Sequence, residues 1–371
     1  MTSAAQDILD AAEAQGFALA GIASAEPSEH ADAVRDWVAE GKHGTMRWIE
    51  NHLDVRLDLQ KLLPGANSVI GVCDAYASGA DLPGAGDNDP DRPRGRIARY
   101  AWGDDYHKVM KKRLHKLADS LAEQYPDHGF RSAVDTAPAL EREIAARAGL
   151  GWQAKNTMLI HPRHGSYTLL GLVVTTMELP TSKQMDFPGA TLEATDHCAN
   201  CTRCIDACPT DAIAKGGYSI DASRCVSYLT IEHRGLIANE LRGGMGDWIA
   251  GCDVCQEVCP YNKIGERHPL KVNDRYEPSP RKFNEGLDLL DILTWTADDR
   301  ARVFQGSALK RIKLDMIRRN AIIAIGNVLD NYDEAEQQKM LDAVRACNDD
   351  ESEIVSVTAR QILAQHARVP A

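Results

Sequence analysis

Apolar positions along the first half of the chain alternate between the spacing of helices and the spacing of strands. A spacing of three and four residues predicts helices over 4–15, 30–50, Asp105–Glu123 and, starting after Pro138, Ala139–Ala148. Short apolar runs predict strands over Ala18–Ala23, Asn67–Ala75, Arg131–Asp135, Thr157–His161 and Tyr167–Glu178. We expect the last two strands to pair across a turn at His161–Gly165. Together these elements predict an α+β domain over residues 1–190.

The pattern changes after residue 190. Residues 191–265 are rich in cysteine and predict a compact ferredoxin-like module, and the charged, proline-bearing stretch Arg267–Lys282 predicts a linker. Amphipathic helices are then expected over residues 283–371, at Leu287–Thr294, Ser307–Val328, Asp333–Cys347 and Ser352–His366. Consecutive helix pairs predict a HEAT-like tail. The stretch Gly79–Pro93, rich in glycine, proline and aspartate, predicts a long loop that is a candidate lid.

Size and charge narrow the classes of protein. A chain of 371 residues predicts more than one domain, and no apolar run approaches the roughly 20 residues of a membrane span. A net charge of −12 argues against a uniformly basic nucleic-acid-binding protein but allows local basic patches. Two such patches are Lys108, Lys111, Lys112, Arg113 and Lys116, and Lys310, Arg311, Lys313, Arg318 and Arg319. Each patch could equally be a solvated helix face.

Eight of the ten cysteines lie within about sixty residues. They are Cys198, Cys201, Cys204 and Cys208 with Pro209 next, then Cys225, then Cys252, Cys255 and Cys259 with Pro260 next. The first four have the C-x2-C-x2-C-x3-C-P spacing of bacterial ferredoxins, in which the fourth cysteine ligates the other cluster. Eight thiolates are the number that two [4Fe–4S] clusters require.

The same logic assigns the ligands of each cluster. The spacing predicts one cluster on Cys198, Cys201, Cys204 and Cys259, and a second on Cys252, Cys255, Cys208 and Cys225. Structural zinc is the alternative, although a zinc site needs four ligands and not this order. Disulfides are disfavoured because the N-terminus lacks the apolar segment of a signal peptide, so we expect a cytoplasmic protein with reduced thiols. Cys73 is expected to be a core thiol, and Cys347 to have no chemical role.

Several motifs extend beyond the cysteine spacing. They are R-Y-A-W-G-D-D-Y-H-K-V-M-K-K-R-L (Arg99–Leu114), V-D-T-A-P-A-L-E-R (Val134–Arg142), A-G-L-G-W-Q-A-K-N-T (Ala148–Thr157), C-V-S-Y-L-T-I-E (Cys225–Glu232) and G-C-D-V-C-Q-E-V-C-P-Y-N (Gly251–Asn262). Together these motifs resemble the epoxyqueuosine reductase family. The segment Phe304–Asn327 is similar to the helical tail of that family.

The resemblance implies a base-off cobalamin held by the N-terminal domain, two [4Fe–4S] clusters, an external electron donor, and a tRNA whose anticodon loop carries epoxyqueuosine. The implied reaction reduces epoxyqueuosine to queuosine at the wobble position. A corrinoid reductive dehalogenase is one alternative, although many carry a twin-arginine export signal that this N-terminus lacks. A ferredoxin-type electron-transfer subunit is another, although most of this chain lies outside the cluster region. We expect a monomer and no membrane partner.

The resemblance also implies that Asp135, in the V-D-T motif, donates the proton to the departing oxygen. An acid that donates at neutral pH needs a raised pKa, so we expect Asp135 to be buried against apolar surface. The alternative is that Asp135 or Thr136 simply caps the helix that follows.

Further contacts to the cofactor are implied at Arg56, Lys155, Asn156, Ser227 and Asp253. Arg56 could instead form a surface ion pair with Asp54 or Asp58, and Ser227 and Asp253 could support the cluster loops. The chain departs from the family at Ala154, where glycine is expected, and at Leu172, where glutamate is usual. Our candidate tRNA contacts are Lys310, Arg311, Lys313, Arg318 and Arg319, displayed along one helix.

Overall fold

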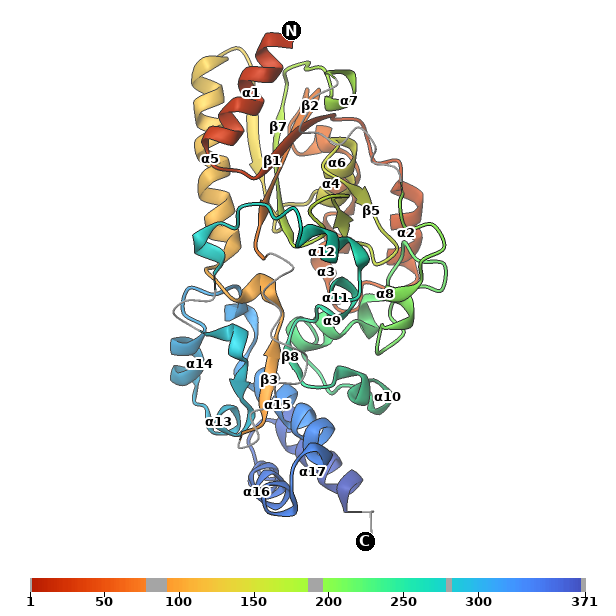
Figure 1. Cartoon of the computed structure of the whole chain (residues 1–371), viewed down its shortest axis with the longest axis vertical. Helices are drawn as coiled ribbons and strands as arrows, with labels where there is room; N and C mark the ends of the chain where they lie inside the picture. The colour runs from red at the N-terminus through yellow and green to blue at the C-terminus, as the bar shows by residue number, and fades with distance from the viewer. Residues whose placement is uncertain (1, 78–91, 186–195, 278–281, 368–371) are drawn as a thin grey trace.

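The computed structural model describes residues 2–77, 92–185, 196–277 and 282–367 (Figure 1). The molecule is elongated, with the two chain ends at opposite poles, the main sheet near the N-terminus, the cysteine region in the middle and a helical body near the C-terminus. In the described part, no helix is long and apolar enough to cross a membrane.

The main sheet is antiparallel and has the strand order β1-β2-β7-β4. Its strands are β1 (Leu19–Ser24), β2 (Ser68–Ala75), β7 (Thr168–Thr175) and β4 (Phe130–Ala133). Each has bounds within three residues of a predicted strand, so these four predictions are confirmed. Because side chains alternate between the faces, Ile70 and Val72 pack beneath α1 (Thr2–Ala14) and α5 (Tyr106–Gln124). Val69 and Val174 pack on the other face, against α6 (Glu141–Arg147).

The predicted pairing of Thr157–His161 with Tyr167–Glu178 is wrong. Strand β6 (Leu159–Ile160) pairs instead with β5 (Trp152–Gln153) in a separate hairpin, and the expected turn holds a single bridge between His161 and Gly165. Gly151 makes the hairpin possible, because its φ is +145° and a Cβ atom there would lie 2.3 Å from the carbonyl oxygen of Ile160.

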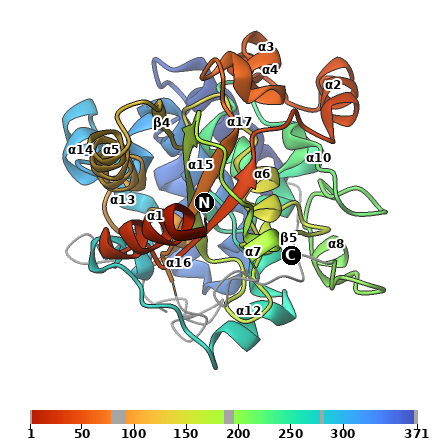
Figure 2. The same cartoon turned by 90° about the horizontal axis from the view of Figure 1, so that it is seen from above.

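Four predicted helices differ from the structure, one of them being Leu287–Thr294, whose first two residues form β9 (Leu287–Asp288) ahead of α13 (Leu289–Thr294). Residues 30–50 contain α2 (Ala31–Ala39) and most of α3 (Arg47–Asn51), which α4 (Leu53–Leu57) follows. Between α2 and α3, Gly44 has a φ of +61°, and a Cβ atom there would lie 2.6 Å from the Tyr228 ring. Helix α6 begins at Glu141, two residues later than predicted. The segment Ser307–Val328 divides into a 3-10 turn, η7 (Ala308–Arg311), and α15 (Leu314–Val328). Seen from above, α2, α3 and α4 lie on the side of the molecule away from α1 and α5 (Figure 2).

A second sheet joins the three parts of the chain. Strand β3 (Arg94–Ile97) runs parallel to β8 (Trp248–Ala250) and antiparallel to β9 (Leu287–Asp288). Ile97 therefore belongs to the same hydrophobic core as Phe304 of the helical body. The stretch predicted as a linker also docks on the main sheet, since Tyr276 is 2% exposed and its hydroxyl donates a hydrogen bond to Asp74.

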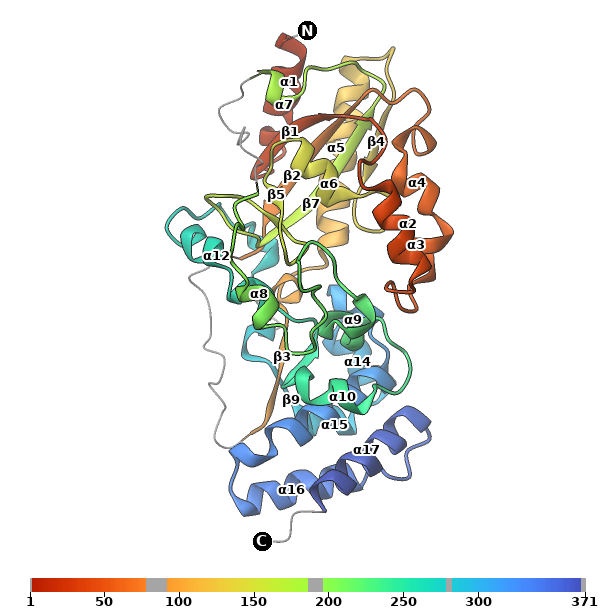
Figure 3. The same ribbon diagram turned by 90° about the vertical axis from the view of Figure 1, so that its right-hand side faces the viewer.

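The remaining elements are short around the cysteines and longer in the helical body, where α15, α16 and α17 form the layer nearest the C-terminus (Figure 3). The short helices are α7 (Ser182–Met185), α8 (Arg203–Asp206), α9 (Val226–Ile231), α10 (Asn239–Arg242), α11 (Val254–Glu257) and α12 (Pro260–Gly265). The body contains α13 (Leu289–Thr294), α14 (Ala297–Val303), α16 (Glu334–Arg345) and α17 (Glu353–His366). The 3-10 turns include η1 (Leu59–Lys61), η2 (Arg99–Ala101), η3 (Ala222–Arg224), η4 (Gly243–Met245), η5 (Asp274–Tyr276), η6 (Phe283–Glu285) and η8 (Leu329–Asn331). Cys73 and Cys347 are both buried. Most of the candidate lid, residues 79–91, lies outside the described residues.

Candidate active site and cluster region

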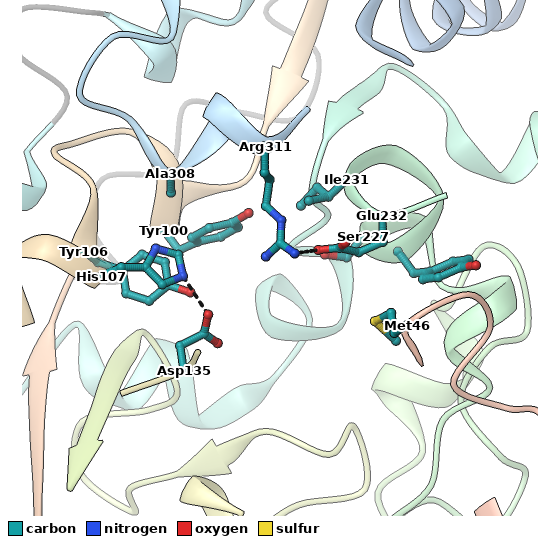
Figure 4. Close-up of a pocket in the computed structure, with 11 residues that line it drawn as sticks. Met46, Tyr100, Tyr106, His107, Asp135, Ser227, Ile231, Glu232, Ala308 and Arg311 are labelled. Carbon is teal, nitrogen blue, oxygen red and sulfur yellow. Dashed lines mark hydrogen bonds and ion pairs between the residues drawn. The ribbon is translucent and has the colours of Figure 1, made fainter. Parts of the chain in front are cut away.

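A pocket of about 230 Å³ lies where the main sheet, the cysteine region and the helical body meet (Figure 4). The N-terminus of α5, the loop between β4 and α6, helix α9 and turn η7 form its walls. The lining residues are Met46, Tyr100, Tyr106, His107, Asp135, Ser227, Tyr228, Ile231, Glu232, Ala308 and Arg311.

His107 is held between two carboxylates on one wall of the pocket. Asp105 caps α5, and its Oδ1 atom accepts hydrogen bonds from the backbone N–H of His107 at 3.2 Å and from Nδ1 of the ring at 2.8 Å. Nε2 of the ring lies 2.6 Å from Oδ2 of Asp135. The imidazole stacks on the Tyr106 ring, with ring centroids 4.0 Å apart. The start of a helix therefore fixes both the position and the orientation of His107.

Asp135 lies in a strained turn after β4. Its φ is +34°, a conformation that non-glycine residues adopt rarely and mostly at functional sites. Its backbone N–H donates to Oε1 of Glu141, and its side chain is 41% exposed. The capping alternative is wrong for both Asp135 and Thr136, because α6 has Leu140 at its N-cap position and no side-chain cap.

The protonation of this site is the opposite of what the sequence led us to expect. Burial raises the pKa of Asp135, but the hydrogen bond and charge of His107, with Tyr106 and Arg311, outweigh it and hold the pKa below its usual value. Burial lowers the pKa of His107, but Asp105 and Asp135 together raise it to about 9. Burial, and then the charge of Asp135, raise the pKa of Glu141 to about 8. Near neutral pH, protons therefore reside on His107 and Glu141, while Asp135 is ionised.

The facing wall carries one ion pair. Nη2 of Arg311 lies 2.7 Å from Oε1 of Glu232, and the Arg311 guanidinium lies 5.6 Å from the centre of the Trp48 ring. Figure 4 shows this pair directed toward the pocket from the side opposite His107 and Asp135. The site thus has a histidine between two carboxylates on one wall and an arginine–glutamate ion pair on the other.

Of the residues implied as cofactor contacts, Ser227 and Asp135 share this pocket. Arg56 does not line the pocket but lies within reach of the charge of Asp135. Burial lowers the pKa of Arg56, while the charges of Glu141 and Asp135 raise it. Nε of Arg56 is buried and has no hydrogen-bond partner within the described residues. A buried donor without a partner is unusual and is consistent with a bound group at this place.

Asp54 and Asp58 have other partners than Arg56. Asp54 pairs with Lys61, and the Asp58 side chain caps η1. The surface ion pairs considered for Arg56 are therefore not among the contacts of the described residues.

Lys155, Asn156 and Asp253 do not line the pocket but hold the cysteine loops. Nζ of Lys155 donates to the carbonyl oxygens of Ala199 and Cys201, at 2.5 and 3.1 Å. Nδ2 of Asn156 donates to the carbonyl oxygen of Cys255 at 3.2 Å. Asp253 is 2% exposed and accepts hydrogen bonds from the Arg99 backbone and the Gln256 side chain. Such contacts orient the loops that carry metal ligands.

The two departures from the family cause no strain. Ala154 is buried and is absent from the described residues with positive φ, whereas Thr157 in the same loop has a φ of +64°. Leu172 is fully buried in the core of the main sheet.

The cysteine thiols fall into two neighbouring groups. Burial and then the charges of Cys198 and Cys204 raise the pKa of Cys259 to about 11. Burial raises the pKa of Cys204, and the charges of Cys198 and Cys201 raise it further. Burial, Cys252 and Cys225 raise the pKa of Cys255, and Cys204 of the first group raises it as well. Burial, followed by the charge of Cys208, raises the pKa of Cys225. The assignment of the eight cysteines to two ligand sets stays a prediction, and eight thiols suit two four-iron clusters chemically.

The basic patch of the helical body is smaller than expected. Arg319 is fully buried, and its guanidinium donates to the carbonyl oxygens of Leu229, His233 and Gly235, so the prediction that it lies on a tRNA-binding surface is wrong. Arg318 pairs with Asp350 at 2.6 Å. Lys310, Arg311 and Lys313 are exposed, and they lie on η7 and just before α15 instead of along one helix.

The other patch lies on α5. Lys108, Lys111, Lys112 and Lys116 are exposed there, while Arg113 turns inward and pairs with Asp74.

Sequence reasoning missed His107 and Glu141. The signal for His107 was its position two residues after the helix-capping Asp105, which fixes the ring at the helix start. Nothing in the sequence indicated that the ring would meet Asp135, 28 residues away.

Comparison with known proteins agrees with this geometry. The model described as "4Fe-4S double cluster binding domain" matches residues 197–262, and "Epoxyqueuosine reductase QueG, DUF1730" matches residues 56–136. The epoxyqueuosine reductase of Xanthomonas campestris is 39% identical over 98% of this chain and 97% of its own. The chain belongs to the epoxyqueuosine reductase family. The Pseudomonas aeruginosa member is 35% identical over 98% of this chain and 94% of its own. The resemblance is thereby confirmed, and the match at 197–262 favours iron–sulfur clusters over structural zinc.

Solved structures of epoxyqueuosine reductases share the fold. A crystal structure with an epoxyqueuosine-modified tRNA-Tyr stem loop is 27% identical, with a TM-score of 0.82 over 97% of this chain and 89% of that one. A Bacillus subtilis structure is 27% identical, with a TM-score of 0.80 over 96% of this chain and 88% of that one. Its aspartate-bearing catalytic loop is described as swung out of the active site.

Proposed function

We propose that this protein reduces epoxyqueuosine to queuosine at the wobble position of tRNA, in the cytoplasm. The observation that carries the proposal is the position of Ser227. It lies two residues beyond Cys225, a predicted ligand of the second cluster, and lines the same pocket as Asp135. Electrons that reach this cluster therefore arrive beside the acid–base groups of the pocket.

The reaction requires two electrons and two protons, because the epoxide becomes an alkene and its oxygen leaves as water. We propose that an external one-electron donor reduces the clusters, which pass the electrons toward the pocket. The acid–base groups of the chain then supply protons to the departing oxygen. We assign the contact with that oxygen to Asp135, and the catalytic aspartate loop described for the Bacillus subtilis structure supports this assignment.

Base-off cobalamin is proposed from the resemblance. When bound, it would supply a reducible cobalt centre that can attack carbon. Asp135, Ser227 and Arg56 are the residues that fit such a group, since two line the pocket and the third has a buried Nε without a partner in the described part. The pocket of about 230 Å³ is smaller than the ~300–1,000 Å³ of sites that enclose a drug-sized ligand. The pocket alone would therefore not enclose a whole corrinoid, and these residues would hold only part of it.

The tRNA is proposed to contact Lys310, Arg311 and Lys313, which are exposed beside or on the pocket wall. The related structure with a modified tRNA stem loop supports RNA as the partner. Recognition of a wobble base requires it to be splayed out of the loop, as is usual for single-stranded RNA sites. We further propose that the helical body is HEAT-like and that the protein acts as a monomer.

The test is complementation of a strain that lacks its own epoxyqueuosine reductase. The chain should convert accumulated epoxyqueuosine to queuosine in total tRNA, measured by nucleoside mass spectrometry. The Asp135→Asn variant is the matched control and should leave the epoxide in place while retaining its iron. Continued accumulation with a well-expressed, iron-loaded wild-type chain would refute the proposal.

A further inference from the structure

His107 meets an acceptor on each of its two ring nitrogens. Oδ1 of Asp105 lies 2.8 Å from Nδ1, and Oδ2 of Asp135 lies 2.6 Å from Nε2. An ionised carboxylate only accepts hydrogen bonds, and a neutral imidazole has only one N–H to donate. Two carboxylate partners are therefore satisfied together only by the doubly protonated, cationic ring.

The other charged groups around the ring do not cancel this preference. On the β4–α6 side, Glu141 has a pKa raised to about 8 by burial and by Asp135, so it is largely neutral at pH 7. Arg56 acts on Asp135 and Glu141 from α4. On the facing wall, Arg311 and Glu232 neutralise each other in one ion pair at 2.7 Å.

Two of the three tyrosines that line the pocket, Tyr100 and Tyr106, do not compete for the proton. Burial raises the pKa of Tyr100 and that of Tyr106, so both hydroxyls stay neutral. The two carboxylates in direct contact thus determine the charge of His107 and give it a pKa of about 9.

We propose that His107 is the proton source of the reaction and that Asp135 relays its proton to the departing oxygen. The proposal rests on the function proposed above. The epoxide accepts two electrons from the reduced clusters and two protons, giving an alkene and water. One proton moves from Nε2 of His107 through Asp135 to the oxygen, leaving neutral imidazole, and solvent supplies the second. His107 then regains its proton from solvent, while Asp105 holds the ring in place.

The contact geometry explains why a relay is needed. An ionised Asp135 is a poor acid by itself, yet it lines the pocket and its side chain is 41% exposed toward it. His107 is only 21% exposed, and its Nε2 atom is directed at Asp135. The proton is therefore stored on the less accessible group and delivered through the accessible one.

The experiment is a pH profile of single-turnover rates on an epoxyqueuosine-containing anticodon stem loop, with anaerobic, fully loaded enzyme and a chemical reductant. In the wild type, the rate should fall as pH rises through about 9, where His107 loses its proton. The His107→Gln variant keeps an N–H for Asp135 but no titrating proton. Its rate at pH 7.5 should fall about 100-fold or more, with unchanged stem-loop affinity. His115→Gln is the matched control, because His115 is exposed on the same helix.

A second variant keeps the test decisive if His107→Gln loses iron or unfolds. In Asp105→Asn, the amide oxygen can still accept both His107 hydrogen bonds, but the negative charge that raises the His107 pKa is gone. The alkaline limb of its pH–rate profile should shift to lower pH. If neither variant changes the alkaline limb of the pH–rate profile, the proposal that His107 supplies the proton through Asp135 is wrong. If the wild type makes no queuosine at any pH, the proposed function itself fails.

Discussion

Replacement of Arg319 by methionine tests whether this arginine is structural or binds RNA. The guanidinium is fully buried and donates to the carbonyl oxygens of Leu229, His233 and Gly235 at 2.7, 2.8 and 2.6 Å. It thereby fastens helix α15 to the end of α9, which forms one wall of the pocket. Methionine fills similar space but donates no hydrogen bond.

The expected loss in the free energy of unfolding depends on how well water can replace the hydrogen bonds of the arginine. Leu229 is 2% exposed, so its carbonyl loses a charge-assisted hydrogen bond worth about 2 kcal/mol. His233 and Gly235 are half-buried, so water recovers part of the other two bonds, which we set at about 1 kcal/mol each. Removing a buried charge returns part of this loss, which leaves about 3 kcal/mol. At about 2 °C per kcal/mol for a large chain, the midpoint of thermal unfolding should fall by about 6 °C.

The assay compares the thermal midpoints of anaerobic holoprotein by circular dichroism, with salt titrations of stem-loop affinity on the same samples. Lys313→Met is the matched control, because this lysine is exposed six residues earlier. Arg319→Met should lower the thermal midpoint and leave the salt dependence of stem-loop binding intact. Lys313→Met should leave the midpoint unchanged and weaken the salt dependence. An unchanged midpoint in Arg319→Met, with a weaker salt dependence, would show that Arg319 meets phosphate and that this reasoning is wrong.

Three further outcomes can be checked. The double variant Lys310→Ala/Lys313→Ala should reduce the slope of log affinity against log salt by roughly 0.7–0.9 for each lost phosphate contact, with unchanged unfolding; an unchanged slope would exclude both lysines from the RNA surface. Cys225→Ser should lower iron from about eight atoms per chain to about four, by metal analysis, and retention of all the iron would exclude Cys225 as a ligand. Because the folded-state pKa of Glu141 is raised to about 8 from 4.5, its contribution to stability is complete below pH 4.5 and is lost as pH rises toward 8. Glu141→Gln should therefore flatten the decline in thermal midpoint between pH 5 and 8, and an equally steep decline would show that Glu141 is already ionised.

The sequence predicted the parts of this molecule whose signal is local. The apolar run over Asn67–Ala75 identified β2, which is buried throughout, and regular cysteine spacing located the cluster region. The sheet partner of a two-residue strand such as β6 carries no such signal, because the glycine contact at Gly151 decides it. Arg319 was mistaken for a surface residue because composition records its charge but not its three carbonyl partners.

In the candidate site, too, the sequence predicted the features with a local signal but not those that depend on tertiary contacts. The motif containing Asp135 predicted an acid at the end of a strand, and the structure places that residue in the pocket. Its protonation could not be predicted, because the pKa depends on contact with His107 from another helix. Charge and motif thus identified the participants, and only tertiary contacts determined which of them holds the proton.

Strand β3 has a consequence for biosynthesis. Its parallel partner β8 begins at Trp248, roughly 150 residues after β3 ends, and translation adds about 5–20 residues per second. An unpaired strand edge must therefore wait for roughly 8–30 s on the ribosome before its neighbour exists. If the gene were divided at residue 190, one fragment would contain β3 and the other would contain both of its partners, β8 and β9. The second sheet should therefore form only when the two fragments are produced together.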